Sequence, residues 1–304
     1  MKRRNFLINS TFTLGALGLS RFTSFADVLA NPVAFNIRML TEKLGVFTEQ
    51  GGTIIFLISD SGISVVDSQF PAQAKNLIEE LKKRYDKPFD LLINTHHHGD
   101  HSGGNIAFKG LVKQVVAHSN SAINQKRVYD EAIKAGKTPA EQYFPTITFD
   151  KKWKYKSGKE TIKAHYFGAG HTNGDAMIHF EDQNVVHMGD LVFNRRYPFI
   201  DRAGGANINS WIKILDKGMD TFGTKTQYVF GHAFDPEKIV GTKNDVRAFQ
   251  DYLEKLLTHV GLEIKAGKSK EEIMKTTAIP GVTEWKGDGI GRGIDAAYQE
   301  LTAK

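Results

Sequence analysis

The sequence predicts an α/β fold in one domain, because short apolar runs typical of buried strands alternate with longer segments whose apolar residues recur at helical spacing. His and Asp residues directly follow several of these runs, which is where α/β folds gather their functional groups. No Ser/Pro/Gly-rich linker and no repeat period divides the chain after residue 26. Residues 27–304 are therefore long enough to form one domain with a substantial core.

The first predicted elements form an antiparallel meander. Turn residues at Gly51-Gly52 and at Asp60-Ser61-Gly62 separate its apolar runs. We expect its strands at residues 35–40, 45–49, 53–59 and 63–66. A helix is predicted over residues 71–85, because Pro71 fits the first turn of a helix.

Strand and helix patterns alternate in the rest of the chain. Strands are expected at residues 89–93, 112–117, 161–167, 185–188 and 228–230. Helices are expected at residues 119–135, 208–222 and 245–260, and the last of these carries a stripe of apolar residues at helical spacing. The alternating lysines and aromatic residues of 151–156 predict a strand with one solvated face.

The segment Thr95-His96-His97-His98-Gly99-Asp100-His101 concentrates potential metal ligands just after an apolar strand. In an extended segment alternate residues share a face, so His96 and His98 can bind one ion while His97 points away. The glycine permits a tight turn, beyond which the Asp and the final His can reach a second ion. Imidazole and carboxylate ligands without a thiol favour zinc, with iron or manganese as alternatives.

Three further segments place a His or Asp just after an apolar strand: Gly168-Ala169-Gly170-His171-Thr172, Val185-Val186-His187-Met188-Gly189-Asp190 and Tyr228-Val229-Phe230-Gly231-His232. Together the motifs HxHxDH, GHT, GD and GH resemble those of the metallo-β-lactamase superfamily, from about residue 35 to the C-terminus. The resemblance implies a four-layer αβ/βα sandwich, in which two sheets pack face to face and helices cover the outside. The site would lie along one edge of that sandwich.

The resemblance also implies a ligand set for two metal ions. One ion would be held by His96, His98 and His171, the other by Asp100, His101 and His232, and Asp190 would bridge them. Superfamily hydrolases of lactones and thioesters carry Asp at the bridging position, where classical zinc β-lactamases commonly carry Cys or Ser. Flavodiiron proteins place Glu at the position of His98, so the motif disfavours that branch. Asp67 is expected to support the HxHxDH loop, because metal-bound imidazoles usually donate their free N–H to a carboxylate or carbonyl.

By this resemblance the protein is a zinc-dependent hydrolase whose metal-bridging hydroxide opens a cyclic or activated amide or ester. Asp100 is expected to orient the hydroxide and to pass a proton to the leaving group, and Asp190 to hold both metals. A β-lactam-like substrate is favoured, and a lactonase or thioester hydrolase of the same fold is the close alternative. An alternative of another class is a mononuclear iron persulfide dioxygenase, which would use only His96, His171 and Asp190.

The segment of residues 194–205 follows the bridging Asp and is expected to form a loop beside the site. Its arginines Arg195, Arg196 and Arg202 are candidates to bind a substrate carboxylate, since the guanidinium group matches carboxylate geometry. Solvation or pairing with Asp201 is the alternative for these arginines. Tyr197 is a candidate donor to a developing oxyanion.

The N-terminus predicts export. The twin-arginine pattern Lys2-Arg3-Arg4-Asn5-Phe6-Leu7, a mildly apolar stretch at residues 12–19 and the small residues around Ser24-Phe25-Ala26 predict a twin-arginine (Tat) signal peptide over residues 1–26. The Tat machinery is then a partner, and the protein is periplasmic or extracellular. The apolar stretch is too short and Gly-rich to span a bilayer stably, and no cysteine is present to carry a lipid, so we expect no stable membrane anchor.

The charge of the chain argues against a nucleic-acid partner. Four of the six net positive charges lie in residues 1–26, so residues 27–304 are close to +2. The lysines of residues 151–156 form the one candidate basic patch, and they are better explained by the solvated face of a strand. The expected partner is therefore a small-molecule substrate.

Overall fold

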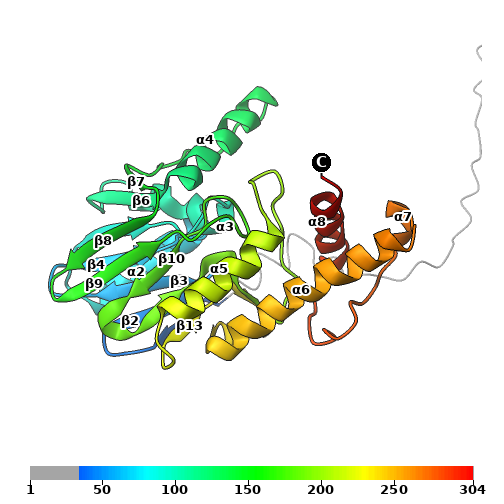
Figure 1. The fold of residues 1–304 in the computed structure, drawn as a ribbon. Coiled ribbons are helices and arrows are strands. Elements are labelled where there is room, and N and C mark those ends of the chain that lie inside the picture. Colours follow the sequence, from blue (N-terminus) through cyan, green and yellow to red (C-terminus); the bar gives the residue numbers. More distant parts are fainter. Residues whose placement is uncertain (1–33, 304) are drawn as a thin grey trace, which may run out of the picture. The chain divides into compact units, whose positions relative to one another are not determined.

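Two β-sheets pack face to face at the centre of the computed structural model, which describes residues 34–303 (Figure 1). The first sheet comprises, in spatial order, β1 (Asn36–Met39), β2 (Leu44–Thr48), β3 (Ile54–Ile58), β4 (Ile63–Val66), β5 (Phe89–Ile93), β6 (Gln114–His118) and β7 (Ile147–Phe149). Neighbouring strands are antiparallel up to β4 and parallel from β4 onwards. The predicted N-terminal meander is therefore present and leads into a parallel half-sheet.

The second sheet comprises, in spatial order, β15 (Val240–Gly241), β13 (Gln227–Val229), β11 (Val185–His187), β10 (Met177–Phe180), β9 (Glu160–His165) and β8 (Lys152–Ser157). Its strands β11 and β13 are parallel, so their C-terminal ends meet at the same edge. A short parallel pair, β12 (Phe193–Asn194) and β14 (His232–Ala233), follows directly from these two strands.

Helices cover the outer face of each sheet and complete four layers (Figure 1). The buried side of α2 (Pro71–Arg84) packs against the first sheet. Helices α5 (Ile208–Thr221), α6 (Lys243–Lys265) and α8 (Ile290–Thr302) share an apolar cluster with the second sheet. The remaining helices are α3 (Gly99–Ser102), α4 (Ser119–Lys134), α7 (Lys270–Ile273) and 3-10 turns at Gly103–Phe108, Glu181–Gln183, Gly189–Leu191 and Pro236–Lys238. The prediction of an α/β fold with an αβ/βα sandwich is confirmed.

Strand β3 shows why the central strands are continuous apolar runs. Every residue of Ile54–Ile58 is buried. Side chains of a strand alternate between its faces, and here Ile55 and Leu57 pack between the sheets while Ile54 and Phe56 pack toward α2. Because both faces are covered, neither set of positions can be polar.

Most predicted elements agree with the structure to within a few residues. The lysines of β8 are exposed and alternate with partly buried Trp153 and Tyr155, as expected for a strand with one solvated face. Helix α8 is not among the predicted elements, although Ile290, Ile294 and Ala297 recur at helical spacing within it. The shortest strands are also absent from the prediction, because two or three residues are too few to show a period.

Residues Phe35–Lys304 form one compact unit. Within the described residues, no helix has the length and apolar character needed to cross a membrane. The predicted signal peptide of residues 1–26 lies outside the described residues, so it stays a prediction.

Candidate metal centre

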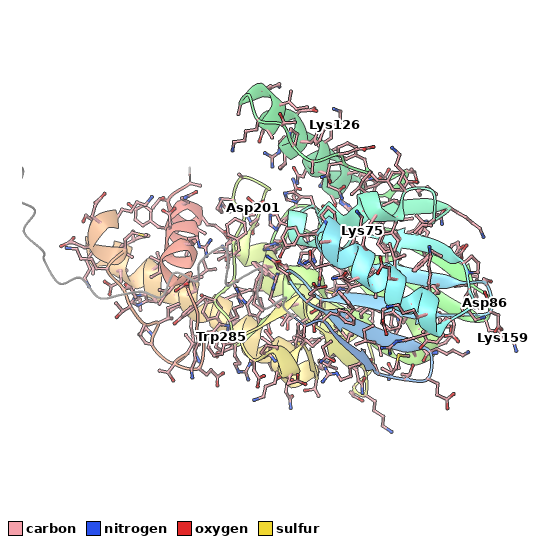
Figure 2. The ribbon with its side chains drawn as sticks, turned by 180° about the vertical axis from the view of Figure 1, so that it is seen from behind. Lys75, Asp86, Lys126, Lys159, Asp201 and Trp285 are labelled. Atoms are coloured by element: carbon pink, nitrogen blue, oxygen red, sulfur yellow. The ribbon has the colours of Figure 1, made fainter. Side chains whose placement is uncertain are left out.

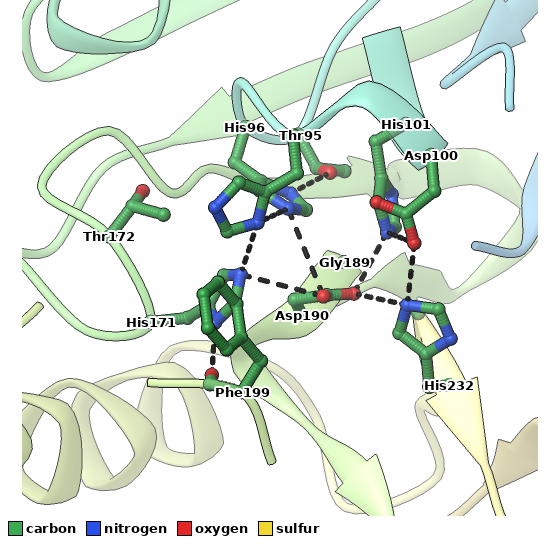
Figure 3. A network of polar contacts seen from close by, with 12 residues as sticks. Thr95, His96, Asp100, His101, His171, Thr172, Gly189, Asp190, Phe199 and His232 are labelled. Carbon is green, nitrogen blue, oxygen red and sulfur yellow. Dashed lines mark hydrogen bonds and ion pairs between the residues drawn. The ribbon is translucent and has the colours of Figure 1, made fainter. Parts of the chain in front are cut away.

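The predicted ligands meet at one edge of the sandwich, where several strands end. His96 and His98 follow β5, His171 follows β9, Asp190 follows β11, and His232 begins β14 just beyond β13. Figure 3 shows His96, His171 and His232 around the Asp190 carboxylate. Residues far apart in sequence are thus brought together by the register of the two sheets.

The first group consists of His96, His98, His171 and Asp190, whose candidate ligand atoms all lie within 4.8 Å of one another. The Nδ1 atom of His98 lies 3.1 Å from Nε2 of His96 and 2.9 Å from Nε2 of His171. The Oδ2 atom of Asp190 lies 3.8 Å from Nε2 of His96 and 3.5 Å from Nε2 of His171. Three ring nitrogens and one carboxylate oxygen therefore face a common point.

The outer hydrogen bonds of these rings fix which nitrogen carries the proton. Thr95 Oγ1 donates to Asp67, so it must accept from Nδ1 of His96, at 3.0 Å. His171 Nδ1 donates to the carbonyl oxygen of Phe199, at 2.7 Å, and His98 Nε2 donates to Asp201, at 2.9 Å. The three inward nitrogens are left as bare acceptors, which is the state a metal requires.

The second group consists of Asp100, His101 and His232. The Oδ2 atom of Asp100 lies 3.1 Å from His232 Nε2. The other oxygen of Asp190, Oδ1, lies 2.9 Å from His101 Nε2 and 3.5 Å from His232 Nε2. Asp190 thus presents one oxygen to each group, so the two groups share a carboxylate.

Both groups have the electrostatic character of a cation site. Burial depresses the pKa of His171 to about 3, so this ring is neutral at physiological pH and can ligate. Burial would also lower the pKa of His232, but Asp190 and Asp100 outweigh it and raise that pKa to about 9. In addition, the buried atoms His101 Nε2 and Asp190 Oδ1, although 2.9 Å apart, do not have the geometry of a hydrogen bond with each other or with any other described residue. The residues present therefore fit a metal ion in each group, because a cation would satisfy both the orphaned atoms and the excess negative charge.

Asp67 lies beneath the HxHxDH loop and accepts hydrogen bonds from three groups. Its donors are the Thr95 backbone N–H, the Thr95 hydroxyl and His101 Nδ1, each at 2.8 Å. Its backbone adopts a left-handed conformation (φ 66°) at the end of β4, which directs the carboxylate under the loop. Buried His187 lies 3.4 Å from the same carboxylate and 3.1 Å from the Thr53 carbonyl oxygen. Asp67 thereby holds the rings that bear the ligand atoms.

Asp201 is a contact of the centre whose position the sequence analysis did not predict. The sequence predicts it only as a partner for arginine, whereas its carboxylate accepts a hydrogen bond from His98 and lies 3.4 Å from Nε2 of His97. Its other oxygen accepts the Gly204 backbone N–H at 2.8 Å, which fixes the carboxylate in the loop. The neighbouring His97 therefore lies beside Asp201, which holds His98, and is not itself one of the candidate ligands of the first group. The sequence feature that indicates this role is an acidic residue in a Gly-rich loop that follows the predicted bridging Asp190.

A cavity of about 380 Å³ opens beside the centre and is the candidate substrate site. Of the substrate-binding candidates, Arg196 and Tyr197 line it. Aromatic Phe193 and Phe199 form part of its wall, and Phe193 stacks on the ring of His232. Asp288 and Arg292, which the sequence analysis did not single out, line it too and come from the C-terminal segment. The rest of the lining is formed by His98, Gly99, Asp100, Asp190 and His232.

The other two candidate arginines, Arg195 and Arg202, do not line this cavity. Arg195 pairs with Glu284 at 3.2 Å and lies over the ring of Trp285, a residue labelled in Figure 2. Arg202 pairs with Glu300 at 3.0 Å and donates to a backbone carbonyl of its own loop. Both arginines join this loop to the C-terminal segment, because their carboxylate partners lie about 90 residues or more along the chain.

The family model of the Metallo-beta-lactamase superfamily matches residues 48–268, a segment that contains all seven predicted ligands. The chain belongs to the metallo-beta-lactamase superfamily. The metallo-beta-lactamase type 2 of Elizabethkingia meningoseptica is 25% identical over 226 residues, which cover 71% of this chain and 85% of that relative. The metallo-beta-lactamase IND-1 of Chryseobacterium indologenes is 25% identical over 230 residues, which cover 73% of this chain and 90% of that relative.

Solved structures of other proteins share this fold. A metallo-beta-lactamase from Pontibacter korlensis has a TM-score of 0.59 at 18% identity, over 73% of this chain and 99% of that one. The stereoselective inverting sec-alkylsulfatase Pisa1 from Pseudomonas sp. has a TM-score of 0.68 at 16% identity, over 88% of this chain and 50% of that one. At these identities the likeness concerns the fold alone. Residues 269–304, which include α8, follow the segment that the family model matches.

Proposed function

We propose that this protein is an exported dinuclear zinc hydrolase that opens a cyclic or activated amide or ester. The observation that carries the proposal is the shared carboxylate of Asp190, with Oδ2 toward one His group and Oδ1 toward the other. Zinc ions bound to the two groups would supply an activated water and would polarise a substrate carbonyl. The donor set of imidazoles and carboxylates, without a thiol, suits zinc.

The residues of the chain have identifiable tasks in such a reaction. Burial would raise the pKa of Asp100, but His101 and His232 outweigh it and lower that pKa to about 2, so the carboxylate is ionised and is available to a metal ion and to an activated water. Its side chain is 28% exposed and lines the cavity, so it can pass a proton to a leaving group. Burial raises the pKa of Tyr197, so the phenol stays protonated and can donate to developing negative charge.

A β-lactam-like ring is the favoured substrate, with lactones and thioesters as the close alternative. The relatives named above are metallo-beta-lactamases, which supports the first class. The Asp at the bridging position supports the second, since superfamily lactone and thioester hydrolases resemble this chain there. A mononuclear iron persulfide dioxygenase is less favoured, because it would leave the buried second group of Asp100, His101 and His232 without a role.

Metal analysis of the purified protein tests the dinuclear proposal. We expect about two zinc ions per chain in the wild type and about one in a His232→Ala variant, because only the second group loses a ligand. Zinc content is measured by plasma mass spectrometry. Hydrolysis is measured with benzylpenicillin and with a neutral lactone as substrates. His259→Ala is a matched control, since that ring bonds only Thr276 among the described residues. A single bound iron, with oxygen consumption on a persulfide substrate, would overturn the proposal.

Export is proposed on the sequence of residues 1–26. Changing Arg3 and Arg4 together to lysine is expected to leave precursor in the cytoplasm, because the Tat receptor reads the arginine pair. Cell fractionation and immunoblotting measure the shift, with Lys2→Arg as a control that keeps the pair. Continued export of the double variant would show that the pair is not a Tat signal.

A further inference from the structure

We infer that Arg292 of the C-terminal helix and Arg196 of the loop after β12 form an anion-recognition site, so that the substrate is a small molecule with one negatively charged group. The inference rests on the proposed function and narrows its substrate class. The two guanidinium groups come from separate parts of the chain and line the same cavity as Asp100 and Asp190. Arg292 lies beyond residues 48–268, which the family model covers.

The C-terminal segment is joined to the loop by backbone hydrogen bonds. The Tyr197 N–H donates to the Lys286 carbonyl oxygen, and the Lys286 N–H donates to the Arg195 carbonyl oxygen, each at 3.1 Å. Arg196 and Lys286 thus pair as an isolated parallel bridge. The ion pairs of Arg195 with Glu284 and of Arg202 with Glu300 add to this connection. The wall that carries Arg292 is therefore fixed relative to the wall that carries Arg196.

The arginines of this region divide into two kinds. Arg195 and Arg202, away from the cavity, each form an ion pair. Within residues 34–303, neither Arg196 nor Arg292 forms an ion pair with a carboxylate, although both line the cavity. Both side chains are exposed, so their guanidinium groups are free to bind an external anion. The argument for such binding is their position, because two guanidinium groups from separate parts of the chain line one cavity and each can bind a carboxylate through two N–H groups.

The surroundings of Arg292 favour a small, partly apolar molecule. The guanidinium carbon of Arg292 lies 5.7 Å from the centre of the Phe199 ring, which places its charge beside an apolar surface. A cavity of about 380 Å³ limits the ligand to a small molecule. Asp288 is the opposing charge in the wall, and it precedes α8, where a negative charge is favourable for the helix N-terminus. Apart from the candidate metal ligands Asp100 and Asp190, the charged residues of the lining are two arginines and Asp288, so this part of the wall has a net positive charge.

A matched pair of substrates separates recognition of the anion from the hydrolysis itself. Benzylpenicillin and its methyl ester contain the same scissile amide, but only the acid carries a charge. For Arg196→Gln and for Arg292→Gln, we expect the ratio of kcat/KM for the acid over the ester to fall about tenfold, chiefly through KM. The double variant should lose more than either single variant, and Asp288→Asn should change the ratio in the opposite direction. Arg247→Gln, on the exposed side of α6, is the control.

The outcomes are distinguishable from a failure of the proposed function. Equal losses on acid and ester in both arginine variants, with no opposite effect of Asp288→Asn, would overturn the anion site and leave the hydrolase proposal standing. If the zinc-loaded wild type hydrolyses neither compound, the proposed substrate class fails instead. Calorimetry on the same zinc-loaded protein then measures Kd for both compounds without turnover. If the wild type binds the acid more tightly than the ester and the double variant does not, the anion site is supported. If the wild type shows no preference for the acid, the anion site is overturned.

Discussion

Replacing Asp190 with asparagine is expected to lower kcat/KM by about a thousandfold or more and to reduce the bound metal below two ions per chain. Both carboxylate oxygens face ligand rings, Oδ1 at 2.9 Å from His101 and Oδ2 at 3.5 Å from His171. An amide keeps the shape of the side chain, but it removes the negative charge and offers one oxygen where the centre uses two. The loss should therefore affect both groups at once, unlike that in His232→Ala.

The measurements for Asp190→Asn are zinc content, steady-state kinetics and thermal unfolding of the metal-loaded protein. Asp216→Asn, at an exposed position of α5, is the control for a change from carboxylate to amide. Retention of two tightly bound metals with near wild-type activity would show that Asp190 is not the shared ligand. An unfolded variant would be identified by its circular dichroism spectrum, and Asp190→Glu, which keeps the charge, then tests the same point.

Replacing Gly52 with alanine is expected to remove the second metal and to lower activity by about a hundredfold, although Gly52 itself bears no ligand. A Cβ atom at this position would lie 2.3 Å from Nε2 and 2.1 Å from Cε1 of the His101 ring. That ring is fully buried and is held on its other side by Asp67 at 2.8 Å, so it cannot move aside without losing this hydrogen bond. Overpacking of this kind typically costs about 1–3 kcal/mol of stability.

Zinc content and thermal unfolding measure the effect of Gly52→Ala. The control is Gly261→Ala on α6, where the nearest atom to an added Cβ is 3.7 Å away, an ordinary contact. Alanine favours a helix over glycine by about 1 kcal/mol, so this control should be neutral or slightly stabilising. Two metals and full activity in Gly52→Ala would mean that the loop at Gly51-Gly52 moves away from the centre and that the close packing on His101 is not required.

Local sequence patterns predicted the α/β fold and several of its strands because burial on both faces leaves a strong signal. The run Phe89–Ile93 is apolar except for Asp90, since it lies between the other sheet and a helix layer, and the candidate ligands His96 and His98 follow it within a few residues. The spacing from strand to ligand is short, so the backbone direction fixes where the side chains go. Helix α8 also carries a periodic pattern of buried residues, although it was not predicted. Strands as short as Phe193–Asn194 have too few residues to show any period.

The sequence by itself determined the chemistry of the centre, because the motifs specify the donor atoms and place each of them just after a strand. Only the tertiary structure decided what surrounds these atoms. Asp201 supports His98 from a loop 103 residues away, and Arg202 is withdrawn from the site by Glu300, 98 residues away. A long side chain reaches whatever the fold brings near it, and that depends on how distant segments pack rather than on its own neighbours in sequence. For this reason the candidate metal ligands follow from local patterns, while the two arginines that line the candidate substrate cavity, Arg196 and Arg292, follow only from the packing of the C-terminal helix against the loop after β12.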